Sequence, residues 1–311
     1  MAKKTTSKAT KKAAKAQKPV KIAETLPTSH TRWVPKGDSG LKMPVIKEGF
    51  VSKARMPDGL SLSVIPRRVS VRQLSAKSLI EAKANPQLAT LHELGINPTL
   101  ITQPDLYPWC AHVMLDMVAH NGQPKVGSGW LIGRRTIITA GHCIYDGGWM
   151  RQILVSPGGP ESSFTKRIPG VYSDTTHDWI YGATAAIREA ADVGMVRLAE
   201  DVTPLTGTLP FSAYTNAQLN AVAPDRLSVA GFPAHSGLFT ADAGTLRQYN
   251  GSHLIYDIET WKGQSGAPVL HWGSNGQPMV IGIHHWDVGN NLNRAIRITP
   301  QAAALLLRWA A

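Results

Sequence analysis

The stretch Trp261-Lys262-Gly263-Gln264-Ser265-Gly266-Ala267-Pro268 decides how the rest of the chain is interpreted. Ser265, with Gly263 before it and Gly266 after it, has the surroundings of a nucleophilic serine whose neighbouring backbone amides bind an oxyanion. A serine hydroxyl is a poor nucleophile unless a base takes its proton, so a histidine and a carboxylate should accompany it. The sequence upstream contains a candidate for each.

Two motifs supply these candidates. His142 lies in Thr139-Ala140-Gly141-His142-Cys143, which ends an apolar, β-branched run, and Asp192 directly precedes another apolar run. The chain order is therefore His142, Asp192, Ser265, whereas an α/β-hydrolase places its acid and its histidine after the serine. Ala267 also stands where the Gly-x-Ser-x-Gly elbow of that fold requires glycine. The three motifs together indicate a Ser-His-Asp triad.

Each candidate also has a purely structural interpretation. Ser265 alone would fit an ordinary turn serine, and His142 would fit a structural histidine beside a buried Cys143. Asp192 would be a strand-edge charge if Asp178, in His177-Asp178-Trp179, were the true acid. We favour Asp192 because an apolar strand follows it, and none follows Asp178.

The composition is that of a globular protein with a basic tail. The chain has 311 residues, 43% of them hydrophobic, which allows one large or two smaller domains with a substantial core. Its formal charge of +12 is typical of a nucleic-acid-binding protein, but residues 1–22 alone hold eight lysines and no acidic residue. The rest of the chain therefore carries only about +4.

Targeting signals and cysteines leave the compartment undetermined. No apolar run of about seven residues follows the lysines of residues 3–21, so no secretory signal is recognisable. The longest apolar run near either end, 302–307, is too short to span a membrane. Two cysteines, Cys110 and Cys143, exclude a small disulfide framework. The protein could act in the cytoplasm or leave the cell by a non-standard route.

The N-terminal third differs from the rest in composition. Residues 1–22 are rich in lysine, alanine, threonine and serine, lack aromatic side chains and are expected to be disordered. Such a tail either makes weak contact with nucleic acid or another anionic surface, or only solubilises the protein. Residues 23–100 are predicted to be a linker or pro-segment with short helices at 75–84 and 85–95.

From residue 107 onward, short β-type runs alternate with Gly, Pro, Asn and Asp. Many short strands separated by regularly spaced turns indicate a sandwich or a barrel, so the predicted fold class is all-β. Pro300 begins an apolar helix that closes the chain. The predicted elements are strands at 110–118, 126–132, 136–140, 152–155, 193–198, 227–230, 244–249, 253–258, 268–272, 279–284 and 294–298, and a helix at 300–310.

With these motifs in place, the region from about residue 107 to residue 309 resembles the chymotrypsin-fold (trypsin-like) serine peptidases, and among them the bacterial glutamyl endopeptidases. The resemblance implies a chymotrypsin-like double β-barrel, with six-stranded barrels at about 101–203 and 204–299, an active site between them and a C-terminal helix. It depends mainly on Ser128-Gly129-Trp130-Leu131-Ile132-Gly133, on residues 139–146 and 263–269, and on Asn293-Arg294-Ala295-Ile296-Arg297-Ile298-Thr299.

The resemblance also implies a role for each residue of the site. Ser265 would attack the scissile carbonyl of a protein or peptide substrate. His142 would take the serine proton and deliver it to the leaving amine, while Asp192 orients His142. The backbone N–H groups of Gly263 and Ser265 would form the oxyanion hole. The resemblance implies that no metal or organic cofactor is needed.

The residues around the expected P1 pocket point in two directions. In glutamyl endopeptidases a threonine five residues before the serine and a histidine on a later strand bind the substrate carboxylate. Thr260 and His284 occupy those positions here, and Lys262 adds positive charge, which favours glutamate or aspartate at P1. Glu259 stands where trypsin-like enzymes place a base-selecting acid, and Asp287 replaces a usual pocket-wall glycine. These two carboxylates favour a basic or neutral P1 side chain instead.

The sequence departs from its relatives at one cysteine. In many of them the cysteine after the catalytic histidine pairs with a partner before the Gly-Trp of the preceding strand, where this chain has Ser128. Cys143 is therefore expected to be a free, buried thiol, and it is no nucleophile because it adjoins His142. We do not expect His284 and His285 to bind a metal as a pair, because adjacent strand residues point to opposite faces.

The N-terminal third suggests a zymogen, since the relatives carry pro-segments and a new N-terminus often completes the substrate pocket. Arg67-Arg68 and Glu93 are the candidate cleavage sites, and a folded accessory segment that stays attached is the alternative. Two other functions compete with proteolysis. One is a protease-like interaction protein with vestigial catalysis, and the other is a nucleic-acid-associated protein recruited by the lysine tail.

Overall fold

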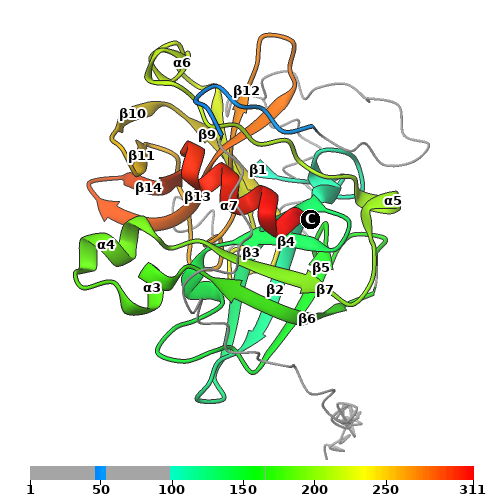
Figure 1. The fold of residues 1–311 in the computed structure, drawn as a ribbon. Helices are drawn as coiled ribbons and strands as arrows, with labels where there is room; N and C mark the ends of the chain where they lie inside the picture. The colour runs from blue at the N-terminus through cyan, green and yellow to red at the C-terminus, as the bar shows by residue number, and fades with distance from the viewer. Residues whose placement is uncertain (1–45, 54–98, 165) are drawn as a thin grey trace, which may run out of the picture.

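The computed structural model describes residues 46–53, 99–164 and 166–311, which contain one six-stranded and one eight-stranded β-sheet. Figure 1 shows these sheets on either side of the C-terminal helix α7 (Pro300–Ala310). Three features expected from the sequence lie outside the described residues. They are the tail 1–22, the two helices at 75–84 and 85–95, and the cleavage sites Arg67-Arg68 and Glu93.

The first sheet closes on itself as an antiparallel barrel, in the order β2-β3-β4-β7-β6-β5. Because successive side chains of a strand point to opposite faces, Val113, Leu115 and Met117 of β2 all enter the barrel core. Ile137 and Val196 enter the same core from β4 and β7. The strands are β2 (His112–Val118), β3 (Pro124–Gly133), β4 (Thr136–Thr139), β5 (Gln152–Pro157), β6 (Ile168–Thr175) and β7 (Gly194–Leu198).

The second sheet also rolls up, because two strands near its opposite edges follow one another directly in the chain. Its order is β1-β9-β8-β12-β13-β14-β11-β10, and only Thr245 separates β9 from β10. Counted as one bent strand, β9 and β10 complete a roll of six strands around Val229, Tyr256 and Val269. The strands are β1 (Thr99–Leu100), β8 (Leu227–Gly231), β9 (Thr240–Gly244), β10 (Leu246–Tyr249), β11 (His253–Tyr256), β12 (Pro268–Trp272), β13 (Pro278–Gly289) and β14 (Leu292–Arg297).

A third apolar cluster joins the two sheets to α7. Trp130 from the first barrel and Leu270 from the second belong to it, together with Leu306 and Trp309 of the helix. Thr299 caps α7 by accepting a hydrogen bond from a backbone amide in the first turn, and a proline occupies that turn, as the sequence predicts. No helix in the described ranges is both long enough and apolar enough to cross a membrane.

The all-β fold and the C-terminal helix are confirmed, and most strand ends lie within two residues of their predicted positions. The sequence does not predict β1, β6 or β9, and β13 continues five residues beyond its predicted end. Residues 110–111, predicted to begin a strand, belong to the 3-10 helix η1 (Trp109–Ala111). Short helices also lie in the connections, at α3 (His177–Tyr181), α4 (Ala185–Ala190), α5 (Thr203–Thr206) and α6 (Asn216–Asn220).

A short N-terminal segment, residues 46–53, lies against the connection between the barrels. The backbone N–H of Gly49 donates to the carbonyl of Ala213 at 2.6 Å, and the N–H of Ser52 donates to the carbonyl of Phe211 at 2.8 Å. The rings of Phe50 and Phe211 lie with their centroids 6.2 Å apart. This part of the predicted linker or pro-segment is therefore bound to the β-domain.

Candidate active site

His142 and Asp192 extend from neighbouring strand ends of the first barrel. β4 ends at Thr139 and β7 begins at Gly194, and these two residues are paired in the sheet. His142 follows β4 in the 3-10 helix η2 (Gly141–Cys143), and Asp192 lies two residues before β7. The pairing of β4 with β7 therefore brings together two side chains that are 50 residues apart in the sequence.

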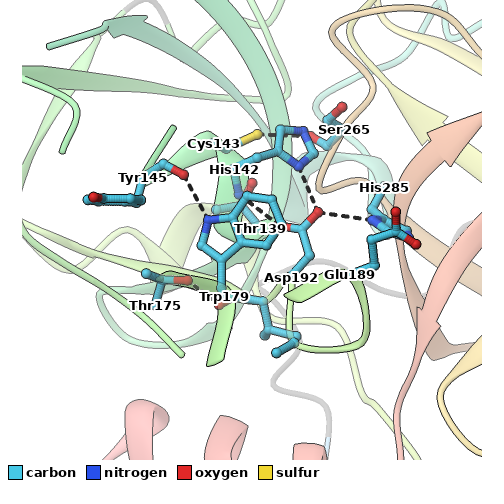
Figure 2. Close-up of polar contacts among 12 residues, drawn as sticks. Thr139, His142, Cys143, Tyr145, Thr175, Trp179, Glu189, Asp192, Ser265 and His285 are labelled. Atoms are coloured by element: carbon cyan, nitrogen blue, oxygen red, sulfur yellow. Dashed lines mark hydrogen bonds and ion pairs between the residues drawn. The ribbon is translucent and has the colours of Figure 1, made fainter. Parts of the chain in front are cut away.

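The Asp192 carboxylate binds His142 through both of its oxygens. Oδ1 accepts the backbone N–H of His142 at 2.8 Å, and Oδ2 lies 2.8 Å from the ring nitrogen Nδ1. The side chain of Asp192 is 1% exposed and that of His142 is 22% exposed, so only the imidazole reaches the surface. Figure 2 shows the imidazole with Asp192 on one side and Ser265 on the other. With its proton on Nδ1, the ring keeps Nε2 as a proton acceptor.

The charges of the pair shift both pKa values. Burial alone would lower the pKa of His142, but the adjacent Asp192 carboxylate raises it well above the ordinary value of 6.5. Burial would raise the pKa of Asp192, but the charge and the hydrogen bond of His142, together with those of His285, lower it below the ordinary value. Asp192 is therefore ionised throughout the neutral range.

Ser265 lies in the turn that leads from β11 into β12. The N–H of Gly266 donates to the carbonyl of His284 at 2.7 Å, and the N–H of His284 donates to the carbonyl of Ala267 at 2.9 Å. Gly266 has a φ of +86°, and a Cβ atom there would lie 2.2 Å from the carbonyl oxygen of Ser128. This position therefore requires glycine, both for its backbone conformation and for its close approach to β3.

Ser128 of β3 connects the serine turn to the first barrel. Its N–H donates to the carbonyl of Ser265 at 2.8 Å, and its hydroxyl donates to the carbonyl of Gly263 at 2.8 Å. The same hydroxyl accepts the N–H of Phe232 at 2.9 Å. The sequence identifies Ser128 only as the residue that replaces a cysteine. The structure shows it fully buried, in contact with both ends of the Gly263–Ser265 segment.

The peptide bond between Lys262 and Gly263 has a fixed orientation. The carbonyl of Lys262 accepts the N–H of Ala234 at 2.7 Å, so the N–H of Gly263, on the other side of a planar trans peptide, points away from Ala234. Gly263 has a φ of +101°, and a Cβ atom there would lie 2.5 Å from the Ala234 nitrogen. Within the described residues, neither the Gly263 nor the Ser265 N–H donates to a protein acceptor, so both amides are available to an oxyanion.

Both cysteines are unpaired and buried, as the sequence predicts for Cys143. The Sγ atom of Cys143 lies 3.7 Å from the backbone carbonyl oxygen of Ser265, on the serine turn. The thiol of Cys110 lies 3.2 Å from the carbonyl oxygen of Thr206, and burial raises its pKa to about 12. The Cys110 thiol therefore stays protonated at neutral pH and contacts the connection after β7.

The residues expected to select the P1 side chain differ in exposure. His284 is buried, and its Nδ1 lies 2.7 Å from the hydroxyl of Tyr256. Burial, reinforced by the nearby histidines 285 and 142, lowers the pKa of His284 to about 3. Thr260 is half-buried. Glu259, Lys262 and Asp287 are exposed to solvent.

Three residues near His142 are not among the site residues predicted from the sequence. His285 Nδ1 lies 2.9 Å from Asp192 Oδ2, and the rings of Trp179 and Trp286 lie 6.2 and 6.4 Å from that of His142. The one sequence signal for His285 is the alternation of side chains along a strand, which directs His285 and His284 to opposite faces. The alternative acid Asp178 is exposed on α3, beside His177.

In the part of the chain that the structure describes, no group of three or more His, Cys, Asp or Glu side chains is placed to hold a metal ion. The adjacent histidines of β13 contact different partners. His284 contacts Tyr256 and His285 contacts Asp192, in keeping with the opposite directions of neighbouring side chains in a strand.

Comparison with known proteins links the site to a family. A family model for the trypsin-like peptidase domain matches residues 127–283, about half of the chain, and this stretch includes His142, Asp192 and Ser265. The glutamyl endopeptidase of Bacillus licheniformis is 29% identical over 229 residues, which are 68% of this chain and 66% of that protein. A protein of Bacillus subtilis named extracellular metalloprotease is 29% identical over 217 residues, 68% of this chain and 67% of that protein. The chain thus spans about two thirds of the length of these curated relatives.

A comparison with solved structures finds a similar fold. The solved structure of a Glu endopeptidase in complex with MPD superimposes with a TM-score of 0.59, covering 70% of this chain and 98% of that chain. The sequence identity is 17%, so this likeness concerns the fold. It agrees with the two rolled sheets of this chain.

Proposed function

This chain belongs to the trypsin-like peptidase family, a family of serine endopeptidases, and from that premise we propose that Ser265, His142 and Asp192 are its catalytic triad. The observation that carries the proposal is the double hydrogen bond between Asp192 and His142 next to the serine turn. The tautomer that this contact fixes leaves Nε2 of the ring free to accept the serine proton.

The reaction then follows from the positions of the residues. Ser265 Oγ attacks the scissile carbonyl while His142 takes its proton, and the ionised Asp192 stabilises the imidazolium. The N–H groups of Gly263 and Ser265 donate to the oxyanion of the tetrahedral intermediate. His142 next gives its proton to the leaving amine as the carbon–nitrogen bond breaks. The acyl group stays bound to Ser265 as an acyl-enzyme. Water then attacks the acyl-enzyme while His142 takes a proton from it. His142 returns this proton to Ser265, and the second product is released.

We further propose that the P1 pocket prefers glutamate or aspartate. With its pKa at about 3, His284 is neutral at the pH of the reaction. If the Tyr256 hydroxyl donates to Nδ1, at 2.7 Å, the His284 proton is on Nε2 and available to a carboxylate. Thr260, half-buried before the serine turn, supplies a second donor.

Glu259 and Asp287, the two residues that would favour a basic or neutral P1 side chain, are exposed. Solvent and salt screen the charges of Glu259 and Asp287, so their repulsion of an acidic side chain is weak. One carboxylate oxygen of Asp287 also accepts the backbone N–H of Gly289 at 2.6 Å. Lys262, on the same turn as Ser265, adds positive charge that attracts an acidic substrate.

A P1 profile tests the proposal directly. Peptides that differ only in having Glu, Gln, Asp, Arg or Phe at P1 would be digested before and after limited proteolysis of residues 54–98. We expect cleavage after Glu to be faster than after Gln by about 10- to 100-fold, because only the carboxylate forms charged hydrogen bonds. Ser265→Ala should abolish all cleavage. His284→Leu should remove the preference for Glu over Gln and leave cleavage after Phe nearly unchanged.

Other outcomes assign the site differently. Cleavage after Arg or Lys that Ser265→Ala abolishes would keep the triad and assign selection to Glu259 and Asp287. A folded and processed sample that neither cleaves nor reacts with a serine-directed fluorophosphonate would contradict the proposal. It would favour an interaction protein with vestigial catalysis.

A further inference from the structure

A second imidazole contacts the carboxylate of Asp192. His285 Nδ1 lies 2.9 Å from Oδ2, the same oxygen that lies 2.8 Å from His142 Nδ1 (Figure 2). The side chains of His285 and Asp192 are each 1% exposed, so no bulk water competes for this contact. Because an ionised carboxylate can only accept hydrogen bonds, both imidazoles donate to it from a protonated Nδ1.

The contact spans the junction between the two barrels. His285 belongs to β13 of the second sheet, whereas Asp192 precedes β7 of the first barrel. The backbone of the neighbouring His284 accepts the N–H of Gly266 at 2.7 Å, in the serine turn. Two consecutive residues of β13 are therefore hydrogen-bonded to the turn that carries Ser265 and to the carboxylate that orients the catalytic base.

The surroundings of His285 fix the orientation of its ring. The ring stacks on that of His253 of β11, with centroids 5.7 Å apart and planes inclined by 14°. His285 Nε2 is buried and has no hydrogen-bond partner in the described part of the chain. A proton on that nitrogen would be an unpaired buried N–H, which favours the tautomer with the proton on Nδ1. Arg294 and Glu189, whose charges act on the stacked His253, form an ion pair with each other at 2.9 Å.

We propose that His285 is a positioning residue that, by donating to Asp192 Oδ2, holds the carboxylate in the orientation that directs His142 toward Ser265. The proposal rests on the triad proposed above. His285 touches neither the scissile bond nor the nucleophile, so it acts through Asp192. Without this donor, the only remaining partner of Oδ2 among the described residues is the imidazole whose Nε2 takes and returns the serine proton during the reaction. Precise placement of such a group depends on donors that take no part in the chemistry.

Two substitutions separate the donor from the volume of the side chain. His285→Leu removes the N–H and keeps an apolar side chain of similar size. His285→Asn places an amide N–H close to the position of Nδ1. We expect His285→Leu to lower kcat by about 10- to 100-fold, the range expected for losing a hydrogen bond to a charged group, with KM changed less than about twofold. His285→Asn should restore most of kcat. The rate of fluorophosphonate labelling should follow kcat in each variant.

A matched control comes from the same sheet. His271 of β12 is half-buried and bonded to the hydroxyl of Tyr214 at 2.8 Å, and it belongs to neither the triad nor the pocket. His271→Asn should leave kcat and KM unchanged. Thermal unfolding of every variant shows whether it is folded at the temperature of the assay.

Proton NMR reports the contact independently of catalysis. An imidazole N–H bonded to a buried carboxylate resonates far downfield of the amide protons. We expect two such resonances in the wild-type protein, one from His142 and one from His285, and only the first in His285→Asn. A single downfield imidazole resonance in the wild type would overturn the proposal, even if the leucine variant does not fold.

The kinetic outcomes distinguish this proposal from the triad. Wild-type labelling rates in both His285→Leu and His285→Asn, together with loss of labelling in Ser265→Ala, would reject the role of His285 and keep the triad. Failure of the folded, processed wild type to react at all would reject the proposed function itself. A leucine variant with low kcat that His285→Asn does not rescue would show that the ring matters for packing and not as a donor.

Discussion

The buried charge of Asp192 determines when His142 can act as a base. Burial opposes protonation of the ring, yet the carboxylate at 2.8 Å raises the pKa of His142 above its ordinary 6.5. In the proposed mechanism, the catalytic form of His142 is the deprotonated one. We therefore expect catalysis above the folded-state pKa of His142 and its loss as the pH falls through that pKa.

We expect kcat/KM of the wild-type enzyme to fall on the acid side with a midpoint above pH 6.5. The pKa of Asp192 is lowered, so this residue stays ionised across the whole transition and adds no second step. Asp192→Asn should move the midpoint to lower pH and lower kcat by about 10⁴-fold, because an amide favours the wrong tautomer of His142. Rates measured with one peptide between about pH 5 and 9 give both values. A wild-type midpoint below 6.5, or one that Asp192→Asn does not move, would contradict the assignment.

The three residues of the proposed triad could be proposed from the sequence because each of them lies in a local motif of its own. Ser128 and His285 could not, since their roles arise from contacts between distant strands. Ser128 donates to a carbonyl 135 residues later in the chain, and His285 contacts a carboxylate 93 residues earlier. Neither residue has neighbours in the sequence that indicate such a partner.

At the scale of elements, α7 attaches the C-terminus to the first barrel. The carbonyl of Trp309 accepts the hydroxyl of Thr136 at 3.1 Å and the guanidinium of Arg197 at 2.9 Å. Its indole N–H donates to Asp174 at 3.1 Å. The ring itself is 5% exposed and belongs to the apolar cluster between the barrels. The last helix of the chain therefore packs on the first barrel, through residues that lie 112 and 173 positions earlier in the sequence.

We expect Trp309→Ala to lower the free energy of unfolding by about 3–5 kcal/mol, because it leaves a cavity in the apolar cluster that joins the two sheets to α7 and removes the indole donor to Asp174 Oδ2. Gln301→Ala, on the exposed face of the same helix, should change it by less than about 0.5 kcal/mol. Denaturant unfolding of the two variants measures the difference. A loss below about 1 kcal/mol for Trp309→Ala would show that α7 contributes little to the stability of the fold.

Among the strands, sequence signals fail where tertiary pairing overrides local preference. β6 contains Pro169 and Gly170, which are unfavourable inside a strand, yet it is paired with β5 on one side and β7 on the other. β9 contains two alanines, an acidic residue and a glycine, and Thr240 is its only β-branched residue. The last residues of β13 are exposed and include Asp287 and Gly289, which are unfavourable in a strand, but β14 pairs with them in a hairpin.

For the molecule as a whole, the attachment of residues 46–53 bears on activation. This segment lies within the region predicted to be a linker or pro-segment, and its backbone is hydrogen-bonded to the connection between the barrels. The hydroxyl of Ser52 accepts the N–H of Phe211 at 2.7 Å, and Phe50 packs on the apolar cluster that joins the two sheets to α7. A cut between residues 54 and 98 would therefore leave this contact surface intact.

We expect the N-terminal fragment produced by such a cut, at Arg67-Arg68 or at Glu93, to remain bound to the peptidase domain. Gel filtration in native buffer should show both pieces in one peak, and denaturant should separate them. Phe50→Ala should release the fragment, because it removes the main apolar contact, whereas Lys53→Ala, at an exposed position, should not. Separation of the unmodified pieces in native buffer would favour a pro-segment that leaves on activation.

The division of the site between the barrels has a consequence for the lifetime of the enzyme. His142 and Asp192 come from one barrel, and Ser265 and His285 come from the other. If the proposed triad carries the activity, an opening of the junction would separate its members while each barrel keeps its strands. We expect such an opened molecule to lose its activity before its neighbours digest it, which would make autolysis in a concentrated population self-limiting.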